Sequence, residues 1–554
     1  MKRRQTIAAI LSALLALQAL AGCSSTQTQT SGGEESTSET EQSSATEPGT
    51  FPISEEPITL KIMVPISANH SKSLGDLEMI QEYEKMANVH VEWDEVSEQA
   101  YNERYKLVLA SNELPDAFGS GFSYDGSIVY RYAKEGLIIP LEDLIESSTV
   151  NMKKYFNERE DFRKLCTYPD GHIYALPSID ENQNIRMGNF IAANYTFLEK
   201  LGMDVPETID ELEEYLRAAT STDLNGDGKN EIGLSFNKTD PTITPNKITR
   251  MFSMFGVSWE PNTYLHYTGE GDFVFAPTMK ETREALEYFH TWYADGLIDQ
   301  EIFTQDAAQL KAKGTDQGVA LGIASTYPEL NGSNAEKNEY HLIPAPKMSN
   351  GEDGIWYRDG LIPGFSANQF FITNVNQYPA ETLRYIDYWM DNSVNALTNR
   401  FGPEGYSWEW IDEENGVWTE TATIPSGETR DMKLSTLYCT WGYGIPYWCF
   451  GDFWSQKEIT VDNALERGAI IRDSYINVAS PGLPAITYEE SDNREALTIK
   501  TDLFKYIDSE IANFLTQGVT DESWNAYVQK CRDLQSERWV ELYSTYYMDM
   551  YGES

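Results

Sequence analysis

The chain has 554 residues, of which 42 are Lys or Arg and 87 are Asp or Glu, so its formal net charge at pH 7 is −45. This length exceeds a single compact core and predicts two or more domains, and a 41% hydrophobic, 12% aromatic composition suffices for globular packing. A surface with this much negative charge repels the phosphate backbone of nucleic acids and the anionic headgroups of lipids. This excludes nucleic-acid binding and electrostatic docking on a membrane.

The chain begins with the pattern of an export signal. Three basic residues precede the apolar stretch Ile7 to Leu20, which is too short for a permanent membrane span. The stretch runs into Leu-Ala-Gly-Cys ending at Cys23, which resembles a bacterial lipobox. We therefore expect residues 1–22 to be a lipoprotein signal peptide and Cys23 to carry the lipid, palmitate included, at the extracellular face of the cytoplasmic membrane. An ordinary secretory peptide with a chance cysteine is the alternative.

Residues 23–57 have the composition of a tether. After Cys23 they are almost entirely Ser, Thr, Gln, Glu, Gly and Pro, and they include acidic but no basic residues. Such a segment buries too little apolar surface to offset the entropy of ordering it. We expect a disordered tether between the lipid and a folded body that begins at residue 58.

Four further cysteines follow: Cys166, Cys439, Cys449 and Cys531. Cys439 and Cys449 are close enough in sequence to pair, and an exported protein can form disulfides. Four cysteines in some five hundred residues do not make a disulfide-stapled scaffold, and none forms a Cys-x-x-Cys motif. We expect free, buried thiols.

The body opens with alternating strands and helices. Ile58–Val64 and Val89–Trp93 are rich in Ile, Val and Leu and predict buried strands, and helices are expected near Leu74–Met86 and over Tyr101–Ala110. Units of about 30 residues in this order are typical of a parallel α/β sheet, here doubly wound.

A second α/β set begins at Ile191–Tyr195 and continues into a helix that Thr208 caps, with Glu211 three residues later to close a capping box. Further on, Trp292 and Trp389 have apolar neighbours at helical spacing, which favours the core over a ligand site.

The motifs LASNELPDAF, EGLIIPLEDLI, DGHIYALPSI, NYTFLEKLGMDVPETIDEL and FLTQGVTDESWNAYVQKCRDL resemble the extracellular solute-binding proteins of carbohydrate ABC importers, in particular a large lipoprotein subgroup of Gram-positive bacteria. The resemblance spans essentially residues 58 to 550. It implies an α/β, two-lobed fold of type II, with discontinuous lobes joined by hinge strands and a ligand cleft between them. Lobe 1 would comprise 58–180 and about 372–435, and lobe 2 about 186–365 and 440–554.

Residues 223–231 have the spacing of a calcium loop. Oxygen-bearing side chains alternate with Gly226 and Gly228, as a hard cation with six to eight oxygen ligands requires. By analogy with an EF-hand the ligands would be Asp223, Asn225, Asp227, the Lys229 carbonyl and Glu231. The twelfth position lacks Glu, and the resemblance favours a single structural Ca²⁺ loop in which the outermost carboxylate is uncertain. A metal-free Asx-rich turn is the alternative.

A carbohydrate site combines aromatic platforms for C–H faces with polar groups for hydroxyls. Aromatic residues gather in Gly- and Pro-rich segments, one of them just beyond LPDAF at the carboxyl end of a predicted strand. Packing in the core is the alternative for each cluster. The candidate ligand-binding residues are Tyr124, Asp125, Asp180, Asn182, Trp356, Arg358, Glu404, Trp408, Trp441 and Trp448. For the cluster with Glu404 and Trp408, packing would include a hairpin built by residues 410–412 and 416–418.

The function expected from this pattern is capture of an oligosaccharide between the lobes and its delivery to the permease subunits of an ABC importer, by a lipid-anchored monomer that is not an enzyme. A secreted glycoside hydrolase would also use aromatics and carboxylate pairs. The six His residues are isolated, and neither Gly-x-Ser-x-Gly nor His-Glu-x-x-His occurs. A peptide or polyamine receptor on the same fold is a third possibility.

Overall fold

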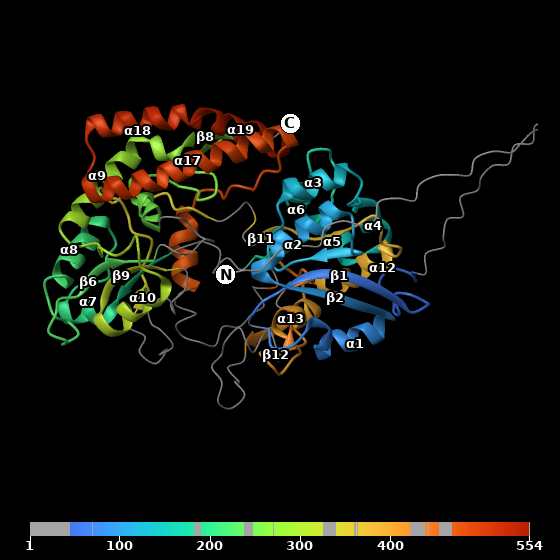
Figure 1. Cartoon of the computed structure of the whole chain (residues 1–554). Helices are drawn as coiled ribbons and strands as arrows, with labels where there is room; N and C mark the ends of the chain where they lie inside the picture. Colours follow the sequence, from blue (N-terminus) through green and yellow to red (C-terminus); the bar gives the residue numbers. More distant parts are fainter. Residues whose placement is uncertain are drawn as a thin grey trace, which may run out of the picture. The chain divides into compact units, whose positions relative to one another are not determined.

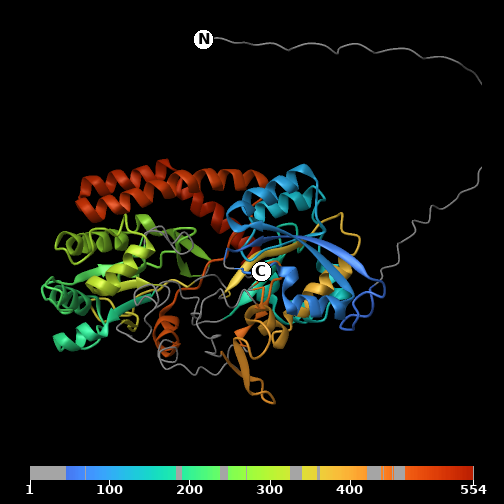
Figure 2. The same ribbon diagram turned by 60° about the horizontal axis from the view of Figure 1, so that its bottom comes forward.

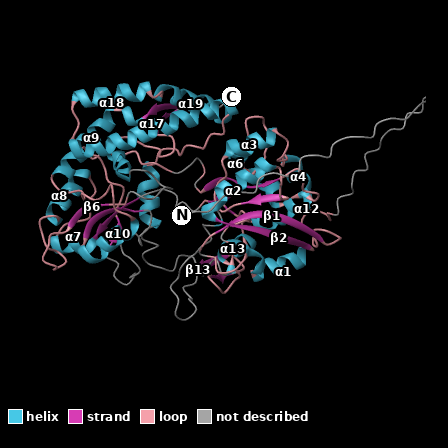
Figure 3. Cartoon of the chain, in the orientation of Figure 1, coloured by secondary structure: helices cyan, strands magenta, loops and turns pink. Residues whose placement is uncertain are grey.

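The computed structural model describes residues 45–68, 70–181, 190–237, 247–269, 271–324, 340–358, 362, 364–420, 438–440, 442–451, 453 and 468–552. Within these ranges the protein is a mixed α/β structure with separate six-stranded and four-stranded sheets (Figures 1 and 3). Two hairpins stand apart from both sheets, β7 (Leu265–Gly269) with β8 (Asp272–Phe275) and β12 (Trp408–Asp412) with β13 (Val417–Glu420).

The six-stranded sheet has the order β14-β4-β11-β3-β1-β2. Strand β1 pairs in parallel with β2 and β3, whereas β11 is antiparallel to both β3 and β4. The sheet is therefore mixed, and the predicted parallel unit is its β3-β1-β2 part. Its strands are β1 (Ile58–Ile66), β2 (Val89–Ser97), β3 (Ala117–Gly119), β4 (Leu176–Asp180), β11 (Phe365–Ile372) and β14 (Trp448–Cys449).

Helices cover both faces of this sheet, and β1 is therefore buried on both sides over most of its length. Ile62 packs with residues of α1 and α12, whereas its neighbour Met63 packs with residues of α2 and α3 on the opposite face. The helices of this part are α1 (Glu78–Ala87), α2 (Glu98–Ser111), α3 (Gly126–Lys134), α4 (Glu142–Ser148), α5 (Asn151–Glu158), α6 (Glu160–Cys166), α12 (Pro379–Asp387) and α13 (Val394–Phe401).

Residues 45–57, which the sequence analysis assigned to the tether, are described and contact the folded body. A bridge between Ala45 and Ser54 closes a loop, which we call the N-terminal strap (Ala45–Ser54). The buried Arg384 of α12 donates hydrogen bonds to four strap carbonyls, and Phe51 packs edge-on against two tyrosine rings. The polar composition that predicted a tether up to residue 57 did not reveal this partner, because Arg384 is distant in sequence.

The four-stranded sheet has the order β10-β5-β9-β6. Strand β5 is antiparallel to β9 and β10, and β6 is parallel to β9. Thr208 and Glu211 form the predicted capping box at the start of α8, which confirms that prediction. The strands are β5 (Phe190–Asn194), β6 (Ile232–Ser235), β9 (Val319–Ala324) and β10 (Tyr340–Leu342), with helices α7 (Tyr195–Leu201), α8 (Ile209–Ala219), α9 (Lys280–Ala294) and α10 (Ala307–Ala312).

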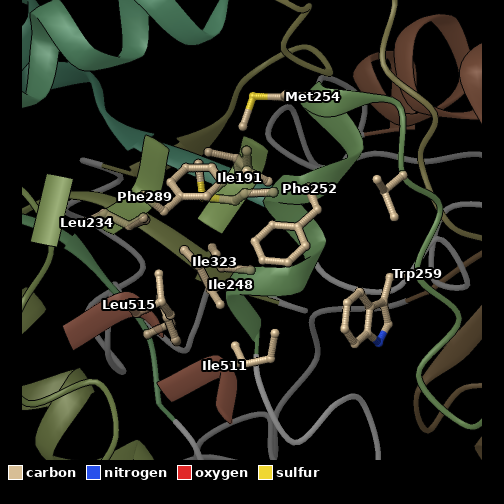
Figure 4. Packing of buried hydrophobic residues seen from close by; sticks show 14 of the residues in the cluster. Ile191, Leu234, Ile248, Phe252, Met254, Trp259, Phe289, Ile323, Ile511 and Leu515 are labelled. Carbon is tan, nitrogen blue, oxygen red and sulfur yellow. The ribbon is translucent and has the colours of Figure 1, made fainter. Parts of the chain in front are cut away.

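One continuous hydrophobic core joins this sheet to the C-terminal helices. In Figure 4 side chains from the strands, such as Ile191 and Leu234, lie with Phe252, Phe289 and Leu515 in the same cluster. Trp292 is fully buried in this core, and Trp389 is buried in that of the six-stranded sheet, as predicted. The helices α17 (Glu490–Gln517), α18 (Asp521–Asp533) and α19 (Ser536–Tyr551), red in Figures 1 and 2, pack against one another.

Three further observations bear on the sequence predictions. Sheet pairing places Phe365–Ile372 and Trp448–Cys449 in the six-stranded sheet, whereas the lobe boundaries expected from the sequence stay a prediction. Among the described helices, none combines the length and the apolar character needed to cross a membrane. The described cysteines, Cys166, Cys439, Cys449 and Cys531, are all free and buried, as predicted.

Candidate ligand-binding residues and the predicted calcium loop

The carboxyl ends of β1, β2 and β3 meet at one edge of the six-stranded sheet, where open α/β sheets bind ligands. A polar group gathers there, which we call the carboxyl-edge cluster (His70, Glu95, Glu98 and Tyr443). The Tyr443 hydroxyl donates to the Glu98 carboxylate, and the His70 and Tyr443 rings meet edge to face with centroids 4.8 Å apart. Each of these side chains except Glu95 therefore contacts another member of the cluster.

The electrostatics of the cluster follow from partial burial. Burial lowers the pKa of His70, although the charges of Glu95 and Glu98 oppose the shift. Burial and the Glu98 carboxylate together raise the pKa of Tyr443. Glu95 is held by Ser73 Oγ at 2.8 Å and by the backbone N–H of Leu74 at 2.6 Å. These two shifts favour the neutral imidazole of His70 and the neutral phenol of Tyr443.

None of the four residues of this cluster is among the ligand-binding residues predicted from the sequence. The strand-end rule was the available signal, but the predicted second strand stopped at Trp93, whereas β2 continues to Ser97. The rule was applied only to the segment beyond LPDAF, so Glu95 and Glu98 were not considered.

Glycine permits the segment that carries Tyr443 to lie across the strand ends. A Cβ on Gly119, the last residue of β3, would overlap the Gly444 carbonyl, and one on Gly444 would lie 2.9 Å from both Val64 and Trp93. The two backbones can approach only because both positions lack a side chain. This contact fixes Tyr443 beside Glu98 even though the two residues are far apart in sequence.

Four of the predicted ligand-binding aromatics are buried. Tyr124 is 3% exposed and Trp356, Trp408 and Trp448 are 0% exposed. Tyr124 bonds to Tyr101 and to the Gly119 carbonyl, and the indoles of Trp408 and Trp448 donate to the carbonyls of Gly402 and Pro177 at 2.8 Å. These rings serve packing in this conformation, and a ligand role for them stays a prediction. The predicted hairpin that carries Trp410 and Trp418 is present as β12–β13.

The other predicted ligand-binding residues differ in their surroundings. Asp125 is exposed and caps α3 by accepting from the N–H of Ser127 at 2.9 Å. Asp180 is buried and forms an ion pair with Arg400 at 2.9 Å. Glu404 is exposed in the turn before β12. Asn182 and Trp441 lie outside the described residues.

Arg358 is half-buried, and its burial lowers the pKa of the guanidinium. It follows Tyr357, whose hydroxyl lies 3.3 Å from a carboxylate oxygen of the buried Glu260. The guanidinium of Arg250 lies over the rings of both Trp356 and Tyr357, 5.8 and 5.1 Å from their centroids. Trp356 therefore belongs to an aromatic and cationic group at the core of the four-stranded sheet, and Arg358 follows this group in the chain.

The predicted calcium loop is a tight turn between α8 and β6. Asp223 accepts hydrogen bonds from the N–H groups of Gly226 and Gly228, and both glycines have positive φ. Asn225 and Asp227 each accept from the N–H two residues on. Within the described chain, no group of three or more His, Cys, Asp or Glu side chains is placed to hold a metal.

Glu231 lies apart from the exposed remainder of the loop. It is 4% exposed, and its Oε1 accepts from the N–H groups of Leu224 and Asn225 at 2.7 Å each. Its Oε2 is buried and has no hydrogen-bond partner among the described residues. Burial raises the pKa of this carboxyl, and the charges of Asp227 and Asp223 raise it further.

Comparison with known proteins identifies the family. The model of the bacterial extracellular solute-binding proteins matches residues 78–400. This chain belongs to that family. Among curated proteins, the solute-binding protein FusA of Streptococcus pneumoniae, the fructooligosaccharide-binding component of an ABC transporter, is 27% identical over 510 residues, which cover 90% of this chain and 91% of FusA.

Solved structures of solute-binding proteins share the fold. FusA in complex with kestose superposes with a TM-score of 0.74 at 25% identity, covering 88% of this chain and 98% of FusA. An HMO-binding solute-binding protein of Bifidobacterium longum infantis gives a TM-score of 0.76 at 21% identity, covering 90% and 100%. The predicted α/β, two-lobed type II fold of the solute-binding proteins is thereby confirmed.

Proposed function

We propose that this solute-binding protein captures an oligosaccharide and delivers it to the permease subunits of an ABC importer, without chemical change. The observation that carries the proposal is the similarity to FusA over 90% of the chain, together with the fold shared with the kestose complex. The carboxyl-edge cluster supports it from the residues, because carboxylates, a phenol and an imidazole are groups that bind sugar hydroxyls.

Calorimetric titration with kestose and longer fructooligosaccharides tests the proposal, with chromatography of the recovered sugar. We expect saturable binding of intact sugar. Glu98→Gln is expected to weaken binding about tenfold, since it removes a charged acceptor. Glu84→Gln is the matched control: Glu84 pairs with His90 near the opposite ends of the strands, and its change should leave the affinity unchanged. Released fructose would favour a glycoside hydrolase, and binding of spermidine alone a polyamine receptor.

Calcium is the second part of the proposal. Asp223, Asn225 and Asp227 would give side-chain oxygens and Lys229 its carbonyl, and Glu231 has a buried carboxylate oxygen without a hydrogen-bond partner in the described chain. A divalent cation at this turn would offset the charges of three carboxylates and join the α8–β6 connection into one unit. An EF-hand mutant of FusA has been solved with fructo-nystose, which supports such a loop in a relative.

The melting temperature measures this part without any sugar. We expect Ca²⁺ to raise it and a chelator to lower it, with Mg²⁺ less effective because it demands a tighter octahedral geometry. Asp227→Asn should reduce the Ca²⁺ effect. A melting temperature that is the same with Ca²⁺ and chelator would favour the metal-free turn.

The third part of the proposal concerns location. Cys23, preceded by a small-residue motif and followed by a polar segment, would be lipidated and would hold the body at the extracellular face of the membrane. The family is extracellular, which agrees with such an anchor.

A further inference from the structure

Three segments of the chain connect the two sheets or their cores, and described residues of each lie at or beside Asp180. The first leaves the six-stranded sheet at Asp180, the end of β4, and enters the four-stranded sheet at Phe190. The second returns from β10 to β11 through Gly364. The third leaves β14 at Cys449 and leads to α17, which packs in the core of the four-stranded sheet.

Backbone hydrogen bonds join these segments side by side. The N–H of Asp180 donates to the carbonyl of Gly364 at 3.1 Å, and the N–H of Glu181 donates to the carbonyl of Cys449 at 2.9 Å. One residue earlier, the N–H of Ile179 donates to the Tyr447 carbonyl at 2.9 Å. The end of β4 is therefore the central strand of a three-segment junction, which we call the hinge root (Ile179–Glu181, Gly364 and Tyr447–Cys449).

Gly364 makes the closest backbone approach in the hinge root. Its φ is +73°, and a Cβ at this position would overlap the Asp180 carbonyl. A side chain here would separate the second segment from β4. Gly351, on the same connection, has φ +82° but no atom within 4 Å of its Cβ position. The two glycines thus share a backbone conformation and differ in contact, which makes them a matched pair.

A buried ion pair links the third segment to β4. Asp180 Oδ2 lies 2.9 Å from Arg400 Nη2, with the two side chains 4% and 10% exposed. The other terminal nitrogen of Arg400 donates to the Tyr447 hydroxyl, so one guanidinium links β4 to the residue before β14. Around it, Glu181 pairs with Arg159 at 2.9 Å and accepts from the Gly451 N–H at 2.8 Å.

The ion pair between Asp180 and Arg400 is expected to add little to the free energy of unfolding. Taking two charges out of water offsets much of their attraction, and buried ion pairs are often replaceable by apolar residues of similar volume. Asp180 Oδ1 is also buried without a hydrogen-bond partner among the described residues, which weakens the pair as a source of stability. What the pair supplies is a fixed position for the three segments.

We propose that Asp180 and Arg400 are positioning residues for ligand capture, which hold the three crossing segments together so that the lobes close about a single hinge root. The inference rests on the proposed capture function. Hinge closure around a ligand depends on a few residues in loops or at the ends of elements, which absorb the change in backbone angles. If the segments moved independently, the open protein would sample more arrangements, and closure would carry a larger entropic cost.

Hydrogen exchange of the full chain without ligand tests the hinge root directly. In Asp180→Asn, and in Arg400→Lys, which keeps a charge but cannot span two partners, amides of the peptide 176–181 should exchange at least tenfold faster. The β1 peptide, 58–66, should be unchanged. Asp387→Asn is the control, because this buried carboxylate caps α5 in the same core, away from the crossings. Equal effects of all three variants on both peptides would overturn the proposal.

Affinity for kestose gives the second measurement. Asp180→Asn, Arg400→Lys and Gly364→Ala should each weaken binding at least fivefold, whereas Asp387→Asn and Gly351→Ala should lower the melting temperature without changing the affinity more than twofold. Unchanged affinity in the three hinge-root variants would overturn the proposal. Failure of the wild type to bind kestose would refute that choice of sugar, and the exchange measurement would still decide the hinge root.

Discussion

Arg384 shows how much of the fold a single residue can hold. Its guanidinium donates to the carbonyls of Thr46 (2.5 Å), Glu47 (2.8 Å), Thr50 (2.8 Å) and Ile53 (3.1 Å). A planar fork with five donors suits this task, and a lysine ammonium does not. Burial lowers the pKa of Arg384, so the strap carbonyls supply the hydrogen bonds that a charge needs away from water.

Arg384→Ala should lower the free energy of unfolding by about 2–3 kcal/mol, since it removes the donor from one buried and three part-buried carbonyls. Urea denaturation measures the loss, and limited proteolysis should show cleavage within the N-terminal strap. Arg384→Lys should recover less than half of the loss. A strap that stays protected in Arg384→Ala would mean that the packing of Phe51 and Ile53 holds it.

His266 makes stability depend on pH. It is buried, its Nδ1 accepts from the Ser258 N–H at 3.0 Å, and burial lowers its pKa below the usual 6.5, although nearby Glu281 acts in the opposite direction. The unfolded chain therefore binds a proton first as the pH falls. The contribution of neutral His266 to the free energy of unfolding is complete above about pH 6.5. It declines as the pH falls toward the pKa of His266 in the folded state.

Acidification from pH 7.5 to 5.5 should therefore lower the free energy of unfolding measured with urea, and His266→Asn should reduce that loss by about 1 kcal/mol. Asn keeps an acceptor near the Nδ1 position and does not titrate. The pKa of His70 is also lowered, so His70 contributes a further part of the change in the free energy of unfolding with pH. A pH slope that is identical in the wild type and in His266→Asn would contradict the prediction.

At the scale of elements, connections between helices and strands carry the predicted calcium chemistry. The loop before β6 meets the turn before β9: the side-chain amide of Asn225 donates to the Gln317 carbonyl at 2.8 Å. The next residue, Gly318, lies directly against Glu231, and a Cβ there would overlap Oε2 and approach Phe197 to 2.8 Å. Two elements far apart in sequence thus set the position of the Glu231 carboxylate.

Gly318→Ala should weaken Ca²⁺ binding at least tenfold, because the added methyl group displaces the Glu231 carboxylate. The control is Gly256→Ala, which has the same φ of +80° but no atom within 4 Å of its Cβ position. Titration with Ca²⁺, followed by melting temperature, measures both. Equal losses in the two variants would assign the effect to backbone strain rather than to Glu231.

At the scale of the whole molecule, the export signal and the folded body make separable contributions. The expected lipid at Cys23 lies outside the described residues, and the N-terminal strap ends the segment that follows it. Cys23→Ala should move the protein from the membrane fraction to the medium while the kestose affinity of the purified chain stays the same. Cell fractionation with antibody detection measures this. Retention of Cys23→Ala in the membrane fraction would favour another form of attachment.

Local pattern predicted the elements well. Strands at Ile58 and Val89 start where the sequence placed them, because a run of buried aliphatic residues is readable within one segment. The first helix begins at Glu78 rather than near Leu74, because Leu74–Asp76 form a separate 3₁₀ turn whose first N–H group, that of Leu74, donates to Glu95. Such a partner, on another element, leaves no local signal.

Tryptophan illustrates why the site was harder to predict. Composition and loop context made Trp356, Trp408 and Trp448 candidates, but whether an aromatic ring faces a ligand or the core depends on what packs against it, and here each ring is covered. Conversely, Glu98 drew no attention as one acid among 87, and only the contact with Tyr443 distinguishes it.

The sequence by itself determined the family, the α/β class, the free cysteines, the α8 capping box and the likeness of residues 223–231 to a calcium loop, because each depends on neighbours in the chain. Only the tertiary structure decided which residues meet: Arg384 with the N-terminal strap, Glu98 with Tyr443, Glu231 with Gly318, and Asp180 with Arg400. These pairs join segments that are distant in sequence, and their chemistry arises from burial and proximity that only folding creates.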